Sequence, residues 1–241
     1  MLPSFMRIIM SDDFDFDKYW LRVFSMCIED YADENIKKQV LEGSENITSE
    51  TPRQEVFDWS KRAINMLDEL VNEEQKYEIM SECSCQYPRS NLKRFKDLYE
   101  DTQDLNTVHC KMQKYFEEVL REQMKLEEKY VEEIIRRGMG MAGKLDGNTI
   151  IATKIPKSSS IVEWFEETDP NKRRALFCHC PRIRDVMDDL DNELPEYYCL
   201  CGAGFYKGIW EFILGKPVKV EVLETVMKGD EVCKIGIYLP E

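Results

Sequence analysis

Six of the nine cysteines in this 241-residue chain stand in three Cys-x-Cys pairs. The pairs are Cys83/Cys85, Cys178/Cys180 and Cys199/Cys201, and each of the two histidines, His109 and His179, adjoins a cysteine. Thiolate and imidazole groups bind borderline metals such as zinc, and they act as nucleophiles near neutral pH. The pattern therefore predicts a cysteine-centred site, and it does not by itself say which chemistry that site performs.

The second and third pairs are separated by about the length of one helix, so they could converge in space. Four thiolates, or three thiolates and an imidazole, would complete a tetrahedral zinc shell, although Cys-x-x-Cys is the more usual spacing. The candidate ligands are Cys178, His179, Cys180, Cys199, Cys201 and Cys233. Two alternatives stay open: the cysteines are small buried hydrophobic residues, or one of them is a nucleophilic or redox-active thiol. Cys83 and Cys85 line a cleft between domains or simply pack there.

Composition and charge limit the partners of the chain. Hydrophobic residues make up 43% and charged residues 33% of the chain, which is typical of a globular protein. No apolar run approaches the ~20 residues of a membrane span, and the N-terminus lacks a signal-peptide pattern, so we expect a cytoplasmic location. A net charge of −14 would repel nucleic acid and anionic membranes, and neither is expected as a partner. In a reducing cytosol, an odd number of cysteines favours metal-binding, catalytic or buried thiols over a disulfide framework.

The first half of the chain has the periodicity of amphipathic helices. Apolar residues recur every three or four positions over about 17–30, 54–71 and 92–99, which predicts three helices. A long helix is expected over 104–137, ended by Gly138 and Gly140. Its apolar face, with Met112 and Val119, leaves open a homodimer formed through this helix. Glycines change the composition at 138–143, so we expect a mainly helical region over 1–143 and an α/β domain over 144–241.

The second half mixes helices with strands, which predicts an α+β fold for the whole chain. A strand is expected at 149–155 and helices at 161–167, 183–190 and 202–214. Alternating apolar residues at 218–222 and 233–239 predict an antiparallel hairpin that turns at Lys228-Gly229-Asp230. A two-residue loop there would place Glu224 beside Cys233 on the core face, where a glutamate needs a cation or a hydrogen-bond partner.

Aromatic residues on the helix expected at 202–214 suggest a ligand pocket. Phe205, Tyr206 and Trp210, together with Glu224, are the candidate ligand-binding residues. Ligand pockets are mostly apolar with a few placed polar groups, which aromatic rings beside cysteine and glutamate would supply. The alternative is ordinary core packing, since aromatic residues dominate cores.

A motif runs through the last part of the chain: a cysteine, a glycine-containing helix, a Leu-Gly turn, a strand and a Gly-Asp-x-x-Cys segment. Its residues are Cys199, Gly204, Gly208, Leu214, Gly215, Val218, Gly229, Asp230 and Cys233. Over about 197–240 this unit resembles the 4-vinyl reductase type of small-molecule-binding domain. The resemblance implies an α/β domain related to the TRAPP-component fold, an apolar ligand pocket and, in some sensor members, a bound zinc. Val222 and Thr225 stand where the zinc-binding members have glutamate and cysteine, so only Cys199 and Cys233 match.

The order of a helical half with a Cys-x-Cys pair and then a cysteine-bearing unit is also similar to the aminothiazoline-carboxylate hydrolase group of bacterial proteins. The chain carries no phosphate-binding glycine loop, Gly-x-Ser-x-Gly or His-Glu-x-x-His motif, so nucleotide enzymes, serine hydrolases and common zinc proteases are not supported. The leading hypothesis is that the chain binds a small apolar or aromatic molecule beside a cysteine cluster that holds zinc. The alternative is a small-molecule enzyme, a hydrolase or a thiol enzyme, with a cysteine nucleophile in the same cleft.

Overall fold

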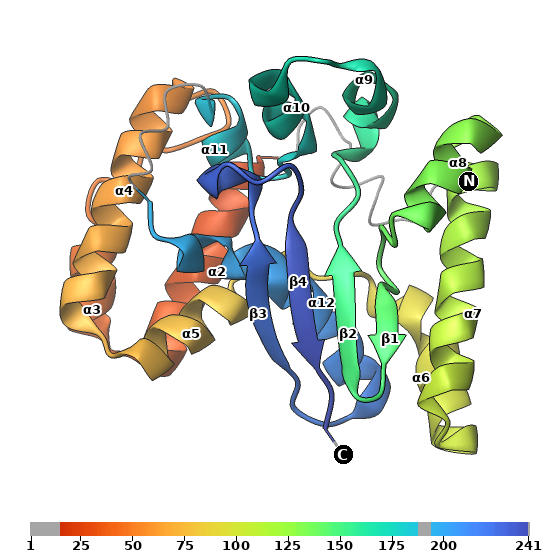
Figure 1. Cartoon of the computed structure of the whole chain (residues 1–241). Coiled ribbons are helices and arrows are strands. Elements are labelled where there is room, and N and C mark those ends of the chain that lie inside the picture. Colours follow the sequence, from red (N-terminus) through yellow and green to blue (C-terminus); the bar gives the residue numbers. More distant parts are fainter. Residues whose placement is uncertain (1–14, 188–193, 241) are drawn as a thin grey trace.

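The computed structural model describes residues 15–187 and 194–240. The described part begins with five helices that stand beside and behind a central sheet (Figure 1). They are α2 (Phe16–Tyr31), α3 (Glu34–Leu41), α4 (Arg53–Leu70), α5 (Glu73–Glu82) and α6 (Arg89–Thr102). The helices expected at 17–30, 54–71 and 92–99 are therefore confirmed, whereas α3 and α5 were not predicted. Helix α5 lacks a clear apolar periodicity and owes its start to a capping box formed by Asn72 and Gln75.

The single long helix expected over 104–137 is wrong. Helix α7 (Leu105–Glu118) continues into a π-helical turn (Val119–Gln123), the chain breaks, and α8 (Glu128–Arg136) follows. The break contains Lys125, whose φ of 53° lies in the left-handed region and cannot continue a helix. Met112, on the face that left a homodimer open, is fully buried in the chain's own core.

Four antiparallel strands form the sheet, in the order β1-β2-β4-β3 (Figure 1). The strands are β1 (Lys144–Asp146), β2 (Thr149–Thr153), β3 (Lys219–Glu224) and β4 (Lys234–Tyr238). Between β2 and β3 come α9 (Ile161–Glu166), α10 (Pro170–Phe177), α11 (Pro181–Arg184) and α12 (Leu200–Leu214). These elements confirm the α+β class and the C-terminal hairpin. The helix expected at 183–190 is short where it is described, and its last residues lie outside the described part.

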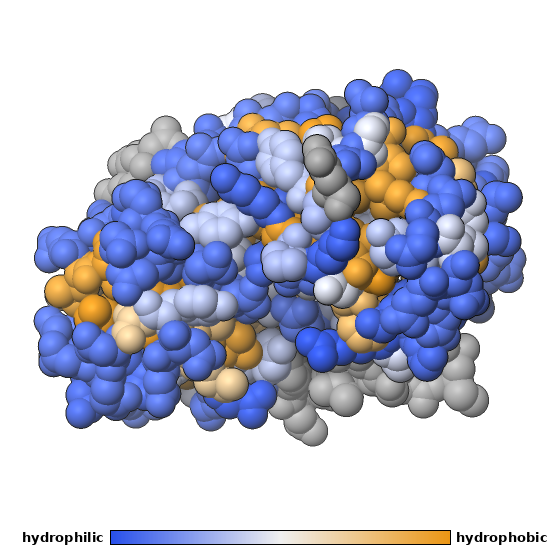
Figure 2. Space-filling model, turned by 90° about the horizontal axis from the view of Figure 1, so that it is seen from below, coloured by the Kyte–Doolittle hydropathy of each residue, from blue (hydrophilic) through white to orange (hydrophobic). Residues whose placement is uncertain are grey.

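One continuous hydrophobic core joins the N-terminal helices to the sheet. Helix α12 lies behind the sheet and packs against α5 and α6 as well as β3. The predicted boundary at 143/144 coincides with the start of β1, yet buried residues from both sides share this core. On the face in Figure 2, hydrophilic residues cover most of the surface and hydrophobic side chains appear in small separate areas. Within the described residues, no helix is long and apolar enough to cross a membrane.

The register of the C-terminal hairpin differs from the predicted one. Val226–Lys228 form a 3-10 turn and Gly229 has a φ of 101°, so the connection is longer than two residues. A bulge between Val222 and Glu224 then pairs Glu224 with Lys234, one residue beyond Cys233. The Glu224 carboxylate accepts from Lys234 Nζ at 2.6 Å. The predicted pairing of Glu224 with Cys233 is therefore wrong, because a bulge changes which side chains stand next to each other.

Candidate functional site

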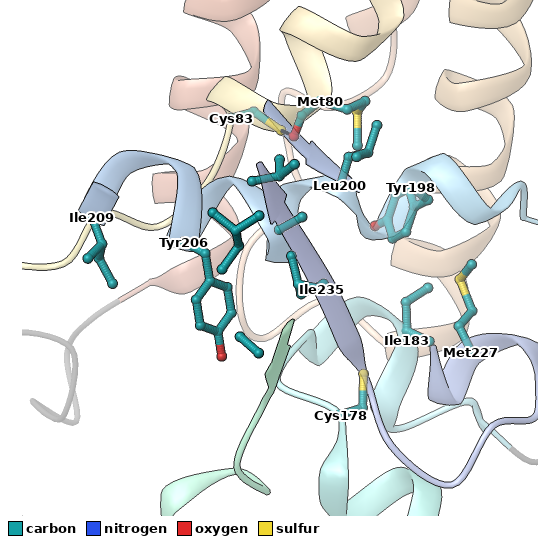
Figure 3. Packing of buried hydrophobic residues seen from close by; sticks show 14 of the residues in the cluster. Met80, Cys83, Cys178, Ile183, Tyr198, Leu200, Tyr206, Ile209, Met227 and Ile235 are labelled. Carbon is teal, nitrogen blue, oxygen red and sulfur yellow. Dashed lines mark hydrogen bonds between the residues drawn. The ribbon is translucent and has the colours of Figure 1, made fainter. Parts of the chain in front are cut away.

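The cysteines gather along α12 and β4. Cys83 and Cys85 come from the α5–α6 connection, Cys178 and Cys180 from the turn between α10 and α11, and Cys233 from the residue before β4. Figure 3 shows Cys83 beside Met80 near one end of the strand that carries Ile235, and Cys178 near its other end. The group therefore extends along the core as two regions with different surroundings: one around Cys201, the other around Thr225.

Cys201 is the second residue of α12, which continues directly from a 3-10 turn over Glu196–Cys199. The adjacent Cys83 thiol acts as a hydrogen-bond partner, and with the nearby Arg182 guanidinium it lowers the pKa of Cys201 to about 6, against the opposing effect of burial. Burial raises the pKa of Cys83 well above its ordinary value. Cys201 is therefore the member of the pair that loses its proton first.

Arg182 lies in the interior, with only 2% of its surface exposed. Its guanidinium carbon stands 3.8 Å from the centre of the Trp20 ring, and its Nε donates to the Tyr198 hydroxyl at 3.0 Å. Its Nη1 lies 3.6 Å from Asp17 Oδ1, and neither of these two atoms has a hydrogen-bond partner. A buried guanidinium needs a compensating negative charge, and this ion pair is too long to supply all of it.

Arg182 shares the Asp17 carboxylate with a second guanidinium group. The Asp17 carboxylate is almost fully buried and also accepts from Arg53 Nη1 at 2.7 Å. Among residues 15–187 and 194–240, this one carboxylate pairs with both arginines. A Cys201 thiolate would add a second negative charge near Arg182, whose guanidinium lowers the pKa of Cys201.

Lys154 adds a further positive charge. It follows β2, and its backbone N–H donates to the Cys233 carbonyl at 2.9 Å. Its Nζ lies 3.2 Å from where a Cβ on Gly202 would be, directly over the first turn of α12. Among the residues that the structure describes, no carboxylate lies within ion-pair distance of Lys154. Its charge favours the thiolate form of Cys201 and of Cys85, although burial still raises the pKa of Cys85 to about 12.

Around Thr225 the hydrogen-bond partners of the cysteine thiols are uncharged, and Lys154 and Asp230 act on them only electrostatically. Cys199 Sγ is hydrogen-bonded to Thr225 Oγ1 at 3.1 Å, and Cys233 Sγ lies 4.0 Å from the same oxygen. Cys199 Sγ also lies 4.0 Å from Met227 Sδ. Burial raises the pKa of Cys178, Cys199 and Cys233, so these thiols stay protonated at neutral pH.

This second region brings together the two cysteines that match the zinc-binding members of the 4-vinyl reductase family. The third position, Thr225, is occupied by a hydroxyl group. Two thiols and a hydroxyl do not fit the four nitrogen or sulfur ligands of a structural zinc site. Across residues 15–187 and 194–240, no group of three or more His, Cys, Asp or Glu side chains is arranged to hold a metal ion. Zinc binding by the six predicted ligands remains a prediction.

The two histidines each contact a backbone carbonyl. His179 Nε2 lies 2.9 Å from the Ile155 carbonyl, which accepts its proton and leaves Nδ1 without one in the neutral ring. His109 Nε2 lies 3.2 and 3.1 Å from the carbonyls of Ala142 and Gly143, so His109 holds the segment before β1 in place. Cys180 keeps partial exposure, and its carbonyl accepts from the Cys178 thiol at 3.8 Å.

The predicted ligand-binding residues are not brought to one place. Trp210 is fully buried and Tyr206 is 3% exposed. The Tyr206 hydroxyl donates to the Gly140 carbonyl, and Phe205 packs edge-on against Tyr87 with ring centres 6.0 Å apart. Glu224 is bound to Lys234 at the sheet. In this structure the three aromatic rings contribute to packing, which was the alternative interpretation of their spacing.

A separate groove of about 550 Å³ lies along the outer edge of β3. Its lining residues include three tyrosines and no cysteine: Tyr77, Glu196, Tyr197, Leu200, Lys219, Val220, Glu221, Val222 and Tyr238. The Tyr77 hydroxyl already accepts from the Val220 backbone N–H at 2.9 Å, so part of this strand edge is hydrogen-bonded. The groove therefore does not extend the cysteine site.

Five important residues were missed by sequence reasoning: Asp17, Trp20, Lys154, Arg182 and Tyr198. Arg182 lies two positions after Cys180, but an arginine in a basic, proline-containing turn ordinarily faces solvent. Asp17 sits in the first turn of α2, where an acidic residue also favours the helix dipole. Neither position carries a sequence signal that distinguishes a buried charge from an exposed one.

Fold and site together define an α+β protein whose cysteines surround the beginning of one helix. Residues 111–241, more than half of the chain, match a family of unknown function (DUF6144), and the chain belongs to that family. The match includes Lys154, Arg182 and Cys201, whereas Asp17, Trp20 and Cys83 precede it. No curated protein and no solved structure matches the chain.

Proposed function

We propose that this protein is a small-molecule enzyme in which the Cys201 thiolate is the nucleophile. The observation that carries the proposal is the position of Cys201 beside the buried guanidinium of Arg182, which shares the Asp17 carboxylate with Arg53 among the described residues. A thiolate at the start of a helix and beside a guanidinium is the usual setting of a reactive cysteine. Cys201 also keeps partial exposure, which a nucleophile needs in order to meet its substrate.

The reaction class follows from the chemistry of a thiolate. Cys201 Sγ attacks an electrophilic carbon of a carbonyl or carbon–nitrogen double bond, an S–C bond forms, and a leaving group departs with a proton from water. The hydroxyl group of that water then cleaves the S–C bond and releases the acid product. The thiolate returns to its starting state, so the net reaction is hydrolysis of the substrate.

The positive charges beside Cys201 favour a substrate that carries a carboxylate or a similar anionic group. Lys154 lies over the first turn of α12 and has no carboxylate partner among the described residues. A substrate anion there would pair with the Lys154 ammonium group. Because the net charge of the chain is −14, such a local cation is needed to attract an anionic substrate.

The proposal is tested by the pH dependence of alkylation. The reduced protein is treated with iodoacetamide between pH 5 and 9, and each cysteine is followed by peptide mass spectrometry. We expect Cys201 to label with an inflection near pH 6, well below the ~8.5 of a free cysteine. Cys110 is exposed on α7 and serves as the internal control for accessibility. If the labelling inflection of Cys201 lies at or above the pH of the Cys110 inflection, Cys201 is not an activated nucleophile and the proposal is wrong.

Binding of a small molecule without catalysis is the second candidate. It is supported by the approach of Cys199 and Cys233 at the positions that match the 4-vinyl reductase family. Elemental analysis of protein purified without chelator or nickel separates the zinc-holding form of this hypothesis from the enzyme. About one zinc per chain, lost in Cys199→Ser but not in Cys201→Ser, would favour the binding domain.

A further inference from the structure

We infer that Cys83 and Cys201 form a reversible disulfide, so that the thiol at the start of α12 is a site of redox modification. The oxidant is a small-molecule disulfide of the glutathione type. The inference goes beyond the proposed hydrolysis and does not depend on it, since it concerns the relation of two protein sulfurs and no substrate.

The close approach of two backbones brings these cysteines together. A Cβ on Gly204 would lie 1.8 Å from the carbonyl oxygen of Ser81 and 2.9 Å from the Ser84 Cβ. Only glycine permits this contact between α12 and the end of α5. Cys83 lies between these two serines, and Cys201 lies one helical turn before Gly204. The two thiols act on each other across the contact, since each changes the pKa of the other.

An ion pair holds the two elements on the other side of the same contact. Lys207 Nζ is paired with the Glu82 carboxylate and also lies 3.0 Å from Glu211 on its own helix. Lys207 follows Gly204 by three residues, and Glu82 precedes Cys83. Two successive contacts along α12 thus fix the positions of the two sulfurs: the close approach at Gly204 and the ion pair of Lys207 with Glu82. A rigid approach of this kind favours an intramolecular disulfide over two separate mixed disulfides.

Exposure decides the order of the two steps. Cys201 is partly exposed, whereas Cys83 is 1% exposed and donates to the Met80 carbonyl at 3.4 Å. The Cys201 thiolate attacks one sulfur of RS–SR, forms Cys201–S–SR and releases RS⁻. Cys83 then attacks Cys201 Sγ, its proton goes to the departing thiolate, and the Cys83–Cys201 bond forms. Overall two protein thiols and one RS–SR give one protein disulfide and two RSH.

The test is disulfide mapping of the full chain in redox buffers of reduced and oxidised glutathione, with free thiols trapped by acid and alkylation. We expect one peptide that joins Cys83 to Cys201, and no glutathione left on Cys201 of the wild-type protein. In Cys83→Ser the reaction should stop at glutathione on Cys201. Cys85→Ser and Cys180→Ser serve as matched controls, since both remove a nearby partly exposed cysteine and should leave the Cys83–Cys201 bond intact.

Two results would overturn the inference: a bond from Cys201 to Cys85, Cys180 or Cys199, or glutathione that persists on Cys201 in the wild-type chain. Serine at position 83 keeps a hydroxyl donor for the Met80 carbonyl, and circular dichroism of that variant checks that it folds. The outcome is independent of the alkylation test. If Cys201 labels fast but forms no bond with Cys83, the disulfide inference is wrong and the proposed nucleophile stands. If Cys201 does not react with iodoacetamide, the proposed nucleophile is wrong.

Discussion

Cys199 and Cys201 are two residues apart, and their surroundings differ more than their sequence positions do. Cys201 meets the Cys83 thiol and the Arg182 guanidinium, whereas Cys199 meets the hydroxyl of Thr225 and the thioether of Met227. Lys154 acts on both cysteines. The first region stabilises a thiolate and the second keeps thiols neutral. The comparison teaches that the chemistry of a cysteine here depends on the charges that the fold brings to it, and not on the Cys-x-Cys spacing that both share.

The largest expected difference between the two regions is in reactivity. Cys201→Ser should abolish the fast labelling by iodoacetamide at pH 6–7, while Cys199→Ser should leave it unchanged. In the wild type we expect Cys201 to label at least ~10²-fold faster than Cys199 at pH 7, because burial keeps Cys199 protonated. Site-resolved mass spectrometry measures both rates. Equal rates for the two sites would erase the distinction.

Removing the buried guanidinium should weaken the charged region alone. Arg182→Met should move the inflection of Cys201 labelling to higher pH. It should also lower the free energy of unfolding by about 3 kcal/mol. The loss is not larger because Asp17 keeps Arg53 as its partner. Arg184→Met, two residues further on, is the matched control, because Arg184 pairs with the exposed Asp185. Urea unfolding and the labelling profile give both quantities. An unchanged inflection in Arg182→Met would contradict the assigned role of this residue.

A methyl group at the contact between α12 and α5 should disturb the Cys83–Cys201 pair. Gly204→Ala places a Cβ against the Ser81 backbone, so we expect a stability loss of about 1–3 kcal/mol and slower labelling of Cys201. Gly202→Ala is the control on the same helix, because its new Cβ meets only the end of the flexible Lys154 side chain. Thermal unfolding of the two variants compares the sites. A larger loss for Gly202→Ala than for Gly204→Ala would argue against the close approach.

The pH dependence of stability has a definite sign. The pKa of Cys201 is lower in the folded chain than in the unfolded chain, so its contribution to stability is present above pH ~9 and is lost as pH falls toward 6. The free energy of unfolding of the wild type, relative to Cys201→Ser, should therefore rise between pH 6 and 9. Chemical denaturation at several pH values in reductant checks this. A difference that falls over this range would mean that the folded protein favours the neutral thiol.

The smallest effect is expected in the neutral region. Thr225→Val removes the hydroxyl that is hydrogen-bonded to Cys199 and that accepts from the Met227 N–H, and should cost about 1–2 kcal/mol of stability. Labelling of Cys201 should not change, because Thr225 belongs to the other region. Thr225→Ser, which keeps the hydroxyl, is the control. Altered labelling of Cys201 in Thr225→Val would show that the two regions are coupled.

The predicted parts of the molecule are those that a local pattern determines. Apolar spacing correctly predicted α2, α4, α12 and the C-terminal hairpin, and the paired cysteines pointed to the segments that meet around α12. The pattern could not show that Lys125 breaks the long helix, since a left-handed residue without glycine has little sequence signature. The pattern also could not show the bulge before Glu224, which changes the register of the C-terminal hairpin.

The charges at the site escaped prediction for a different reason. Arg182 and Asp17 come from α11 and α2, which are far apart in sequence, and each looks like an ordinary surface residue by itself. Their burial follows from tertiary packing around Trp20, which no periodicity encodes. The spacing of Cys199 and Cys201 suggested a shared ligand set, whereas the fold directs the two thiols to different partners.

The contact between α12 and α5 also ties chemical competence to the completion of folding. The Lys207–Glu82 ion pair beside it joins residues that are 125 positions apart in the chain. The groups that lower the pKa of Cys201 likewise come from distant parts of the chain, Cys83 after α5 and Arg182 in α11. The lowered pKa is therefore a property of the folded chain alone, and the labelling rate of Cys201 at pH 6–7 would report on how much of the protein is native.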